Sequence, residues 1–146
     1  MAEVGHLVRR FVGMLSRRPP APDDEAWAAS SLSTGEQALW VQLGHADRRH
    51  SIIVARRFVA LRPGATRPEI AGALLHDIGK LDADLGVLGR VAATVVGPRG
   101  ARLRRYHDHE RLGAELLADV GSAAETVDLV KGRGPAADDL RRADHI

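Results

Sequence analysis

The feature that most constrains this chain is an apolar segment that runs directly into two ionisable residues. No side chain from Ile70 to Leu75 is polar. His76 and Asp77 follow at once and are succeeded by Ile78. A helix that is apolar on every face is a buried helix, so His76 and Asp77 are predicted to lie inside the protein. An ionised carboxylate buried without a partner is strongly destabilising, and Asp77 must therefore be protonated, salt-bridged, hydrogen-bonded or bound to a cation.

The rest of the sequence favours an all-α fold in a single compact domain. The 146 residues suffice for one domain with its own hydrophobic core. Aromatic residues make up only 3%, so Leu, Val, Ile and Ala must fill that core, and Ala and Leu are strong helix formers. Strict apolar/polar alternation over the length of a strand is absent. We expect an N-terminal helix and connection over residues 1–33 and a compact helical bundle over residues 34–146.

Capping residues and prolines predict where the helices begin and end. Ser33 and Thr66 are each followed three residues later by a glutamate, the capping-box pattern that opens a helix. The proline-rich residues 18–30 are expected to form a connection without a helix. The expected helices cover residues 4–16, 33–43, 47–61, 66–78, 84–96, 103–120, 123–131 and 136–143.

A second histidine is predicted to lie beside His76 and Asp77. In the expected 47–61 helix, His50 shares a mostly apolar stripe with other residues at helical spacing. These are Ile53, Val54, Arg57, Phe58 and Leu61. A short turn then leads into the 66–78 helix, and an antiparallel pair would bring the start of the first helix near the end of the second. Neutral imidazole is the commonest metal ligand, so these residues indicate a metal site.

A further carboxylate is needed, because three ligands do not complete a divalent site. The chain has no cysteine, so thiolate ligands are excluded. The carboxylate candidates are Asp47, Asp82, Asp84, Asp108 and Asp144. Asp144 shares a helical side with Leu140 and Ala143, which directs it towards the core, but spacing alone does not choose among the candidates. Imidazole and carboxylate donors together suit manganese, iron, nickel, cobalt or zinc.

One histidine, a later His-Asp pair and a distant aspartate form a recognisable pattern. It is carried by Arg49-His50-Ser51-Ile52-Ile53-Val54-Ala55, by His76-Asp77-Ile78-Gly79-Lys80 and by Ala143-Asp144. This pattern resembles the HD-domain superfamily of metal-dependent phosphohydrolases over about residues 48–146. The resemblance implies that residues 34–146 form an HD-type helical domain. It also implies a ligand set for one divalent metal ion, made of His50, His76, Asp77 and Asp144.

The segment from His107 to Leu117 also resembles this superfamily. Some of its branches carry a histidine at the position of His109 that binds a second metal. Those branches usually add a histidine pair after a helix like residues 127–130, where this chain has Lys131-Gly132-Arg133-Gly134 instead. A second metal is therefore not expected, and His109 or Arg133 is expected to face the substrate.

The resemblance implies hydrolysis of a nucleotide or another small phosphate ester by a metal-activated water. The enzyme would be a phosphomonoesterase or a phosphodiesterase. Asp77 would accept a proton from the water, Lys80 would stabilise charge on the phosphoryl oxygens, and His109 would protonate the leaving group. The alternative is a non-catalytic HD-type module that binds a metal or a nucleotide, which the missing second-metal histidines favour.

Charge and hydropathy bear on nucleic-acid binding, membrane contact and cellular location. The net charge is only +2, and the arginine cluster at residues 99–105 has no accompanying recognition motif, so nucleic-acid binding is not expected. No uncharged apolar run approaches the length needed to span a membrane, and no secretory signal is visible. A cytoplasmic protein without membrane contact is expected, and the sequence leaves its oligomeric state open.

Overall fold

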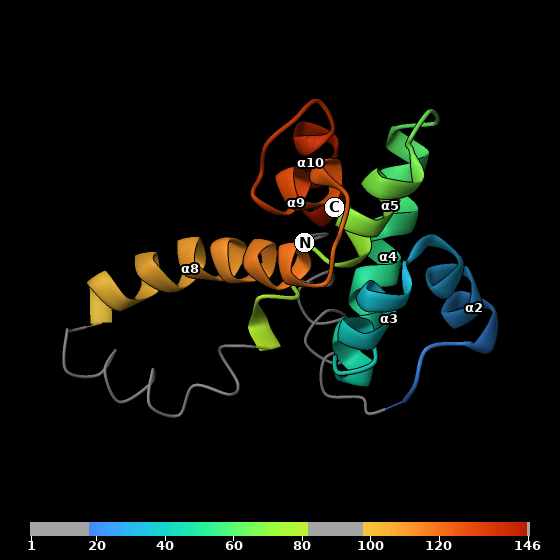
Figure 1. Ribbon diagram of the computed structural model, residues 1–146, viewed down its shortest axis with the longest axis horizontal. Coiled ribbons are helices and arrows are strands. Elements are labelled where there is room, and N and C mark those ends of the chain that lie inside the picture. The colour runs from blue at the N-terminus through green and yellow to red at the C-terminus, as the bar shows by residue number, and fades with distance from the viewer. Residues whose placement is uncertain (1–17, 82–97, 146) are drawn as a thin grey trace, which may run out of the picture.

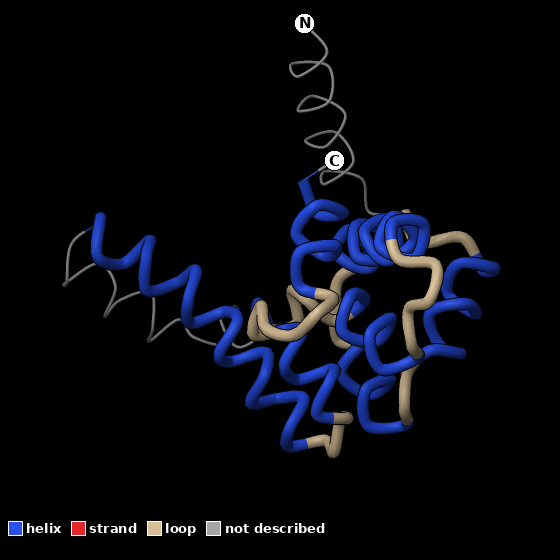
Figure 2. The backbone as a smooth tube through the Cα atoms, turned by 90° about the horizontal axis from the view of Figure 1, so that it is seen from above, coloured by secondary structure: helices blue, strands red, loops and turns tan. Residues whose placement is uncertain are grey.

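The computed structural model describes residues 18–81 and 98–145, with side chains from residue 109 onwards in the second range. Every regular element in these ranges is a helix, so the described part of the chain is all-α, as predicted (Figure 2). The helices are α2 (Pro22–Ser31), α3 (Thr34–Trp40), α4 (His45–Leu61), α5 (Arg67–Leu74), α8 (Pro98–Asp119), α9 (Ala124–Val130) and α10 (Ala137–His145). Among them, none is long and apolar enough to cross a lipid bilayer. The helices expected at residues 4–16 and 84–96 lie outside the described residues.

Both predicted capping boxes are confirmed. The Glu36 carboxylate accepts a hydrogen bond of 2.8 Å from the Ser33 backbone N–H, and the Ser33 hydroxyl accepts one of 3.2 Å from the Glu36 N–H. Thr66 and Glu69 make the same reciprocal pair at 2.9 and 3.3 Å. Each box satisfies backbone donors that the first turn of a helix leaves without a partner, so α3 and α5 begin where the sequence predicts.

The prediction that residues 18–30 contain no helix is wrong, because α2 begins at Pro22. Proline is well tolerated in the first turn of a helix, where its missing N–H has no intrahelical partner. The acidic residues Asp23, Asp24 and Glu25 come next and interact favourably with the positive end of the helix dipole. The prolines therefore precede a helix instead of excluding one.

The expected end of the 66–78 helix is also wrong, because α5 ends at Leu74 and residues 75–79 form tight turns. Their backbone bonds run from residue i to i+3, as in the 3.0 Å bond from the Ile78 N–H to the Leu75 carbonyl. The turns that replace the last part of the expected helix place the Gly79 backbone directly against α8. A Cβ added at Gly79 would lie 1.9 Å from the His109 carbonyl oxygen.

The core is built around α5, which contacts α4 on one side and α9 on the other, while α10 packs on α4 (Figure 1). The most buried large side chains of the core come from several segments of the chain. They are Leu32, Val54, Phe58, Leu74, Leu75, Ile78 and Leu117. Ala28 and Leu32 belong to this same core, so α2 packs into the bundle together with residues beyond 33.

Arg62 links three segments at one end of the bundle. Its guanidinium lies 3.2 Å from the Glu69 carboxylate of α5 and 3.3 Å from the Asp139 carboxylate of α10. Because Arg62 itself follows directly on α4, these two ion pairs hold α10 against the α4–α5 pair. The later residues of α10 are thereby brought over the turn that contains His76.

Gly79→Ala is expected to lower the free energy of unfolding by about 1–3 kcal/mol, because the new methyl group would collide with a backbone carbonyl that has little room to move. Gly64→Ala is the matched control, since a Cβ there has nothing within 4 Å. Thermal unfolding followed by circular dichroism measures both. Equal melting temperatures for the two variants would contradict the tight contact between the 75–79 turn and α8.

Glu69→Gln is expected to lower the free energy of unfolding at neutral pH by on the order of 1 kcal/mol, because an amide keeps the cap but not the charge. Burial opposes ionisation of Glu69, yet the Thr66 N–H and the Arg62 guanidinium outweigh it and hold the pKa of this carboxyl below its usual value of 4.5. The contribution of the Glu69 charge to the free energy of unfolding is therefore complete above about pH 4.5. It is lost as the pH falls through the lower pKa of Glu69 in the folded protein.

Urea unfolding at a series of pH values measures this difference between wild type and Glu69→Gln. The control is Glu115→Gln, which removes an exposed carboxylate 3.9 Å from Arg111 on α8. Exposed pairs contribute little, so this variant should follow the wild type at every pH. A Glu69→Gln effect that persists undiminished in acid would contradict a role for the Glu69 charge.

Candidate metal centre

His50 reaches the site from the first half of α4. The buried face of α4 contains Ser51, Ile52, Val54, Ala55 and Phe58. Ile53, which was expected on the same stripe, is 49% exposed, so this part of the prediction is wrong. The buried face is rotated from the predicted one, and His50 lies at its edge with a side chain that is 25% exposed. From this position His50 faces both the core and an open cavity.

His76 reaches the same place from the turn that follows α5. Its Nδ1–H donates a 2.7 Å hydrogen bond to the Ala73 carbonyl oxygen. Because a carbonyl oxygen can only accept, Nδ1 carries a hydrogen and the ring is held in one orientation. Nε2 then points towards His50, and the two ring centroids are 6.1 Å apart. The prediction that His50 lies beside His76 is confirmed.

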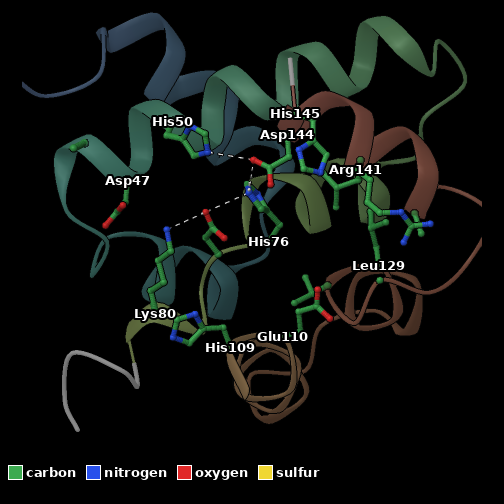
Figure 3. A pocket seen from close by; sticks show the side chains of 16 residues that line it. Asp47, His50, His76, Lys80, His109, Glu110, Leu129, Arg141, Asp144 and His145 are labelled. Carbon is green, nitrogen blue, oxygen red and sulfur yellow. Dashed lines mark ion pairs between the residues drawn. The ribbon is translucent and has the colours of Figure 1, made fainter. Parts of the chain in front are cut away.

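Asp144 completes the group from α10 (Figure 3). Its Oδ1 lies 3.3 Å from His50 Nε2 and 3.6 Å from His76 Nε2. The ligand atoms of these residues all lie within 4.8 Å of one another. Three elements far apart in the sequence thus bring two imidazoles and one carboxylate together, and this group could hold a metal ion.

Two atoms of the group lack the hydrogen bonds that burial normally demands. His76 Nε2 and Asp144 Oδ1 are both buried, and neither has a hydrogen-bond partner. Buried polar atoms without partners are rare in folded proteins and call for a specific explanation. Donors bound at about 2.1 Å to one ion lie roughly 3.0–3.4 Å apart, which is close to the 3.3 and 3.6 Å between Asp144 Oδ1 and the two imidazole nitrogens. The donor types and their spacing therefore fit a divalent transition metal.

The charges in this group depend strongly on one another. Burial opposes protonation of His76, but the Asp144 and Asp77 carboxylates outweigh it and raise the pKa of His76 to about 10. The neighbouring His50 and His76 imidazoles hold the pKa of Asp144 well below its usual range. A proton on His76 thus offsets the carboxylate charge in the metal-free protein. A divalent cation bound here would take over that role and release the proton.

Asp77 lies next to this group. Its Oδ2 is 3.3 Å from His76 Nε2 and also 3.3 Å from Lys80 Nζ. Burial disfavours the carboxylate, but His76 and Lys80 overcome this and hold the pKa of Asp77 well below its usual range. Asp77 is therefore ionised and shared between the imidazole and the ammonium group. Its predicted role as a fourth metal ligand stays a prediction.

The group opens into a cavity of about 350 Å³ that other candidate residues also line. Lys80 and His109, for which catalytic roles were predicted, both lie on its wall, as does the carboxylate candidate Asp47 (Figure 3). Arg133, expected to face the substrate, is exposed and is not among the lining residues that the structure describes. Asp82, Asp84 and the side chain of Asp108 lie outside the described residues.

Sequence reasoning missed three further lining residues, Glu110, Arg141 and His145. Arg141 stands three positions before Asp144 on the same helix, a spacing that places both on one side of it. Glu110 and His145 each stand directly beside a predicted site residue. These spacings could have pointed to them, but exposed charged residues on helices are too common for spacing alone to single them out.

No family model matches this chain, and no curated protein or solved structure matches it either.

Single alanine substitutions of His50, His76 and Asp144 are each expected to weaken Mn²⁺ binding at least about tenfold, because each removes one donor atom from the group. Isothermal titration calorimetry on the purified chain measures the affinity, and circular dichroism checks that each variant folds. His45→Ala is the matched control, since His45 is an exposed histidine at the start of the same helix. If the site variants bind Mn²⁺ as His45→Ala does, the metal lies elsewhere.

Proposed function

We propose that this chain is a metal-dependent phosphohydrolase of the HD-domain type that acts on a nucleotide or another small phosphate ester, as a phosphomonoesterase or phosphodiesterase. The observation that carries the proposal is the convergence of His50, His76 and Asp144 at the wall of a cavity, with ligand atoms within 4.8 Å of one another. These are the residues that the superfamily resemblance picks out as metal ligands, and they come from three separate elements. One divalent metal ion is proposed, with Asp77 beside it as the fourth ligand.

A bound divalent metal would supply a Lewis acid that lowers the pKa of a coordinated water and polarises a phosphoryl oxygen. In the overall reaction the water oxygen forms a bond to phosphorus and the ester P–O bond breaks. The alcohol leaves with a proton. The chain's own contribution is to position the ester in the cavity and to stabilise the charge that develops on it.

Lys80 is well placed to stabilise the phosphoryl group. Its ammonium group lies 3.3 Å from Asp77 Oδ2 and on the cavity wall, and the side chain is 41% exposed. Asp77 holds the ammonium group beside His76 while leaving donors free for a phosphoryl oxygen. Negative charge grows on these oxygens during hydrolysis, so a fixed cation there favours the transition state over the substrate.

Asp77 and His109 have the proposed proton-transfer roles. In the metal-free protein, His76 and Lys80 hold the pKa of Asp77 well below its usual range, so its carboxylate is ionised. Its proposed role is to accept a proton from the attacking water. His109 lies on the cavity wall and makes no hydrogen bond to any described residue, so its imidazole is free to protonate the leaving alkoxide.

The second candidate function is metal binding without turnover, in a module of the same fold. It is favoured by one observation: the described residues contain only one group of metal-ligating side chains. The two functions differ in a direct measurement. Mn²⁺-loaded protein that binds the metal but releases no alcohol from any of a panel of phosphate mono- and diesters would support the binding module and contradict the hydrolase.

Lys80→Ala is expected to lower kcat for phosphate release by roughly a hundredfold, because it removes the fixed cation that stabilises the transition state. Mn²⁺ affinity should remain close to that of the wild type, which separates this role from metal binding. Lys131→Ala is the matched control, since Lys131 is exposed and is the chain's other lysine. A Lys80→Ala variant with wild-type kcat would contradict the proposed role of Lys80.

A further inference from the structure

The cavity has a second polar end, formed by Glu110, Gly132 and Arg141. A Cβ built on Gly132 would lie 3.9 Å from Arg141 Nη1 and 3.9 Å from Glu110 Oε2. The guanidinium and the carboxylate therefore flank the same point, which stays open because Gly132 has no side chain. In Figure 3 the labelled side chains of Glu110 and Arg141 lie on the opposite side of the cavity from His50 and Lys80.

The charges at this end disfavour a second anionic group. Arg141 is already in contact with the Asp138 carboxylate, so its positive charge is offset. Glu110 makes no ion pair or hydrogen bond to any described residue, which leaves its carboxylate available to a ligand. This end of the cavity is thus lined by one carboxylate and by one guanidinium that already has a carboxylate partner in Asp138, so a further phosphate or carboxylate gains little net attraction here. A hydroxyl group suits both partners, because it can accept from Arg141 and donate to Glu110.

Apolar side chains also line the cavity. Leu129, Val130 and Leu140 are buried residues that line the cavity. Its volume of about 350 Å³ is near the lower limit of small-molecule pockets, which range over roughly 300–1,000 Å³. The described residues that line the cavity include no Phe, Tyr or Trp. They therefore offer a nucleobase no phenyl, phenol or indole ring to stack on. These features favour a compact ligand with a short carbon skeleton.

Building on the proposed hydrolase function, we propose that Glu110, Gly132 and Arg141 bind hydroxyl groups of the substrate, which is a phosphate monoester of a small polyhydroxylated alcohol such as a sugar. The phosphate lies at the end with Lys80 and the metal-ligating group. The hydroxyl groups lie at the other end. Glu110 and Arg141 are substrate-binding residues in this arrangement and determine which alcohol is accepted.

Binding of phosphonates, which cannot be hydrolysed at the position of the ester bond, tests this assignment separately from turnover. Mn²⁺-loaded protein is titrated by calorimetry with the phosphonate analogue of ribose 5-phosphate, with butylphosphonate and with 4-phosphonobutyrate. The sugar analogue is expected to bind about tenfold more tightly than the other two, because only it places hydroxyl groups beside Glu110. Glu110→Ala should remove this advantage, whereas Glu115→Ala, an exposed residue on the same helix, should keep it.

A second pair of variants tests the space at Gly132. Gly132 and Gly134 both have positive φ angles, of 77° and 93°, so alanine strains the backbone at either position. Only at Gly132 would the new methyl group point between Arg141 and Glu110, since nothing lies within 4 Å of a Cβ at Gly134. Gly132→Ala should therefore weaken binding of the sugar analogue at least about fivefold more than Gly134→Ala, while both variants keep their Mn²⁺ affinity.

Each other outcome has a definite meaning. Tightest binding of 4-phosphonobutyrate would show that Arg141 recognises an anion. Equal binding of all three ligands would show that the end formed by Glu110, Gly132 and Arg141 recognises none of them. Either result overturns the assignment. A fourth ligand, the phosphonate analogue of adenosine monophosphate, separates a nucleoside from a free sugar as the source of the hydroxyl groups. If Mn²⁺ binds but no phosphonate does, the site recognises no phosphate monoester and this inference is overturned, whereas the hydrolase function is decided separately by turnover of the ester panel.

Discussion

The structure depends on how charged groups are balanced inside the junction of α4, the 75–79 turn and α10. Two imidazoles and two carboxylates meet there, and part of each is removed from water. Such a group is stable only when its charges are neutralised and its polar atoms have partners. In the metal-free protein, a proton on His76 and the ammonium group of Lys80 together neutralise the two carboxylates, but His76 Nε2 and Asp144 Oδ1 still have no hydrogen-bond partner. A metal ion held by His50, His76 and Asp144 would fulfil both conditions, which is the physical basis of the proposed site.

The surrounding fold is arranged so that this junction can form. Arg62 joins the end of α4 to α5 and α10 through two ion pairs, and these bring Asp144 over His76. The Ala73 carbonyl fixes the orientation of the His76 ring from within the end of α5. In the proposed arrangement, one end of the cavity beside the junction would hold the phosphate and the other the hydroxyl groups. Metal binding and substrate choice would then depend on different residues, and mutations would separate them.

Much of the fold could be predicted from local sequence signals. The capping residues Ser33 and Thr66 gave the starts of α3 and α5, because a capping box depends only on residues a few positions apart. The proximity of His50 and His76 followed from one short turn between two helices. One error was local, because proline is tolerated in the first turn of a helix and α2 begins at Pro22. The others arose where contacts distant in sequence matter: the 75–79 turn lies against α8, and packing on α4 leaves Ile53 exposed. Arg141 and Glu110 were missed because only the folded chain brings them together.

The close approach of the 75–79 turn to α8 has a consequence for recognising distant homologues. A Cβ at Gly113 would lie 3.1 Å from the Gly79 backbone nitrogen, just as one at Gly79 would meet α8. Each glycine therefore restricts what evolution can place at the other. Proteins that have diverged too far for overall sequence similarity to be detected should still keep glycine at both positions if they keep this junction. A sequence search that requires glycine at the positions of Gly79 and Gly113, as well as His50, His76 and Asp144, would be more selective than a search for the His-Asp pair alone.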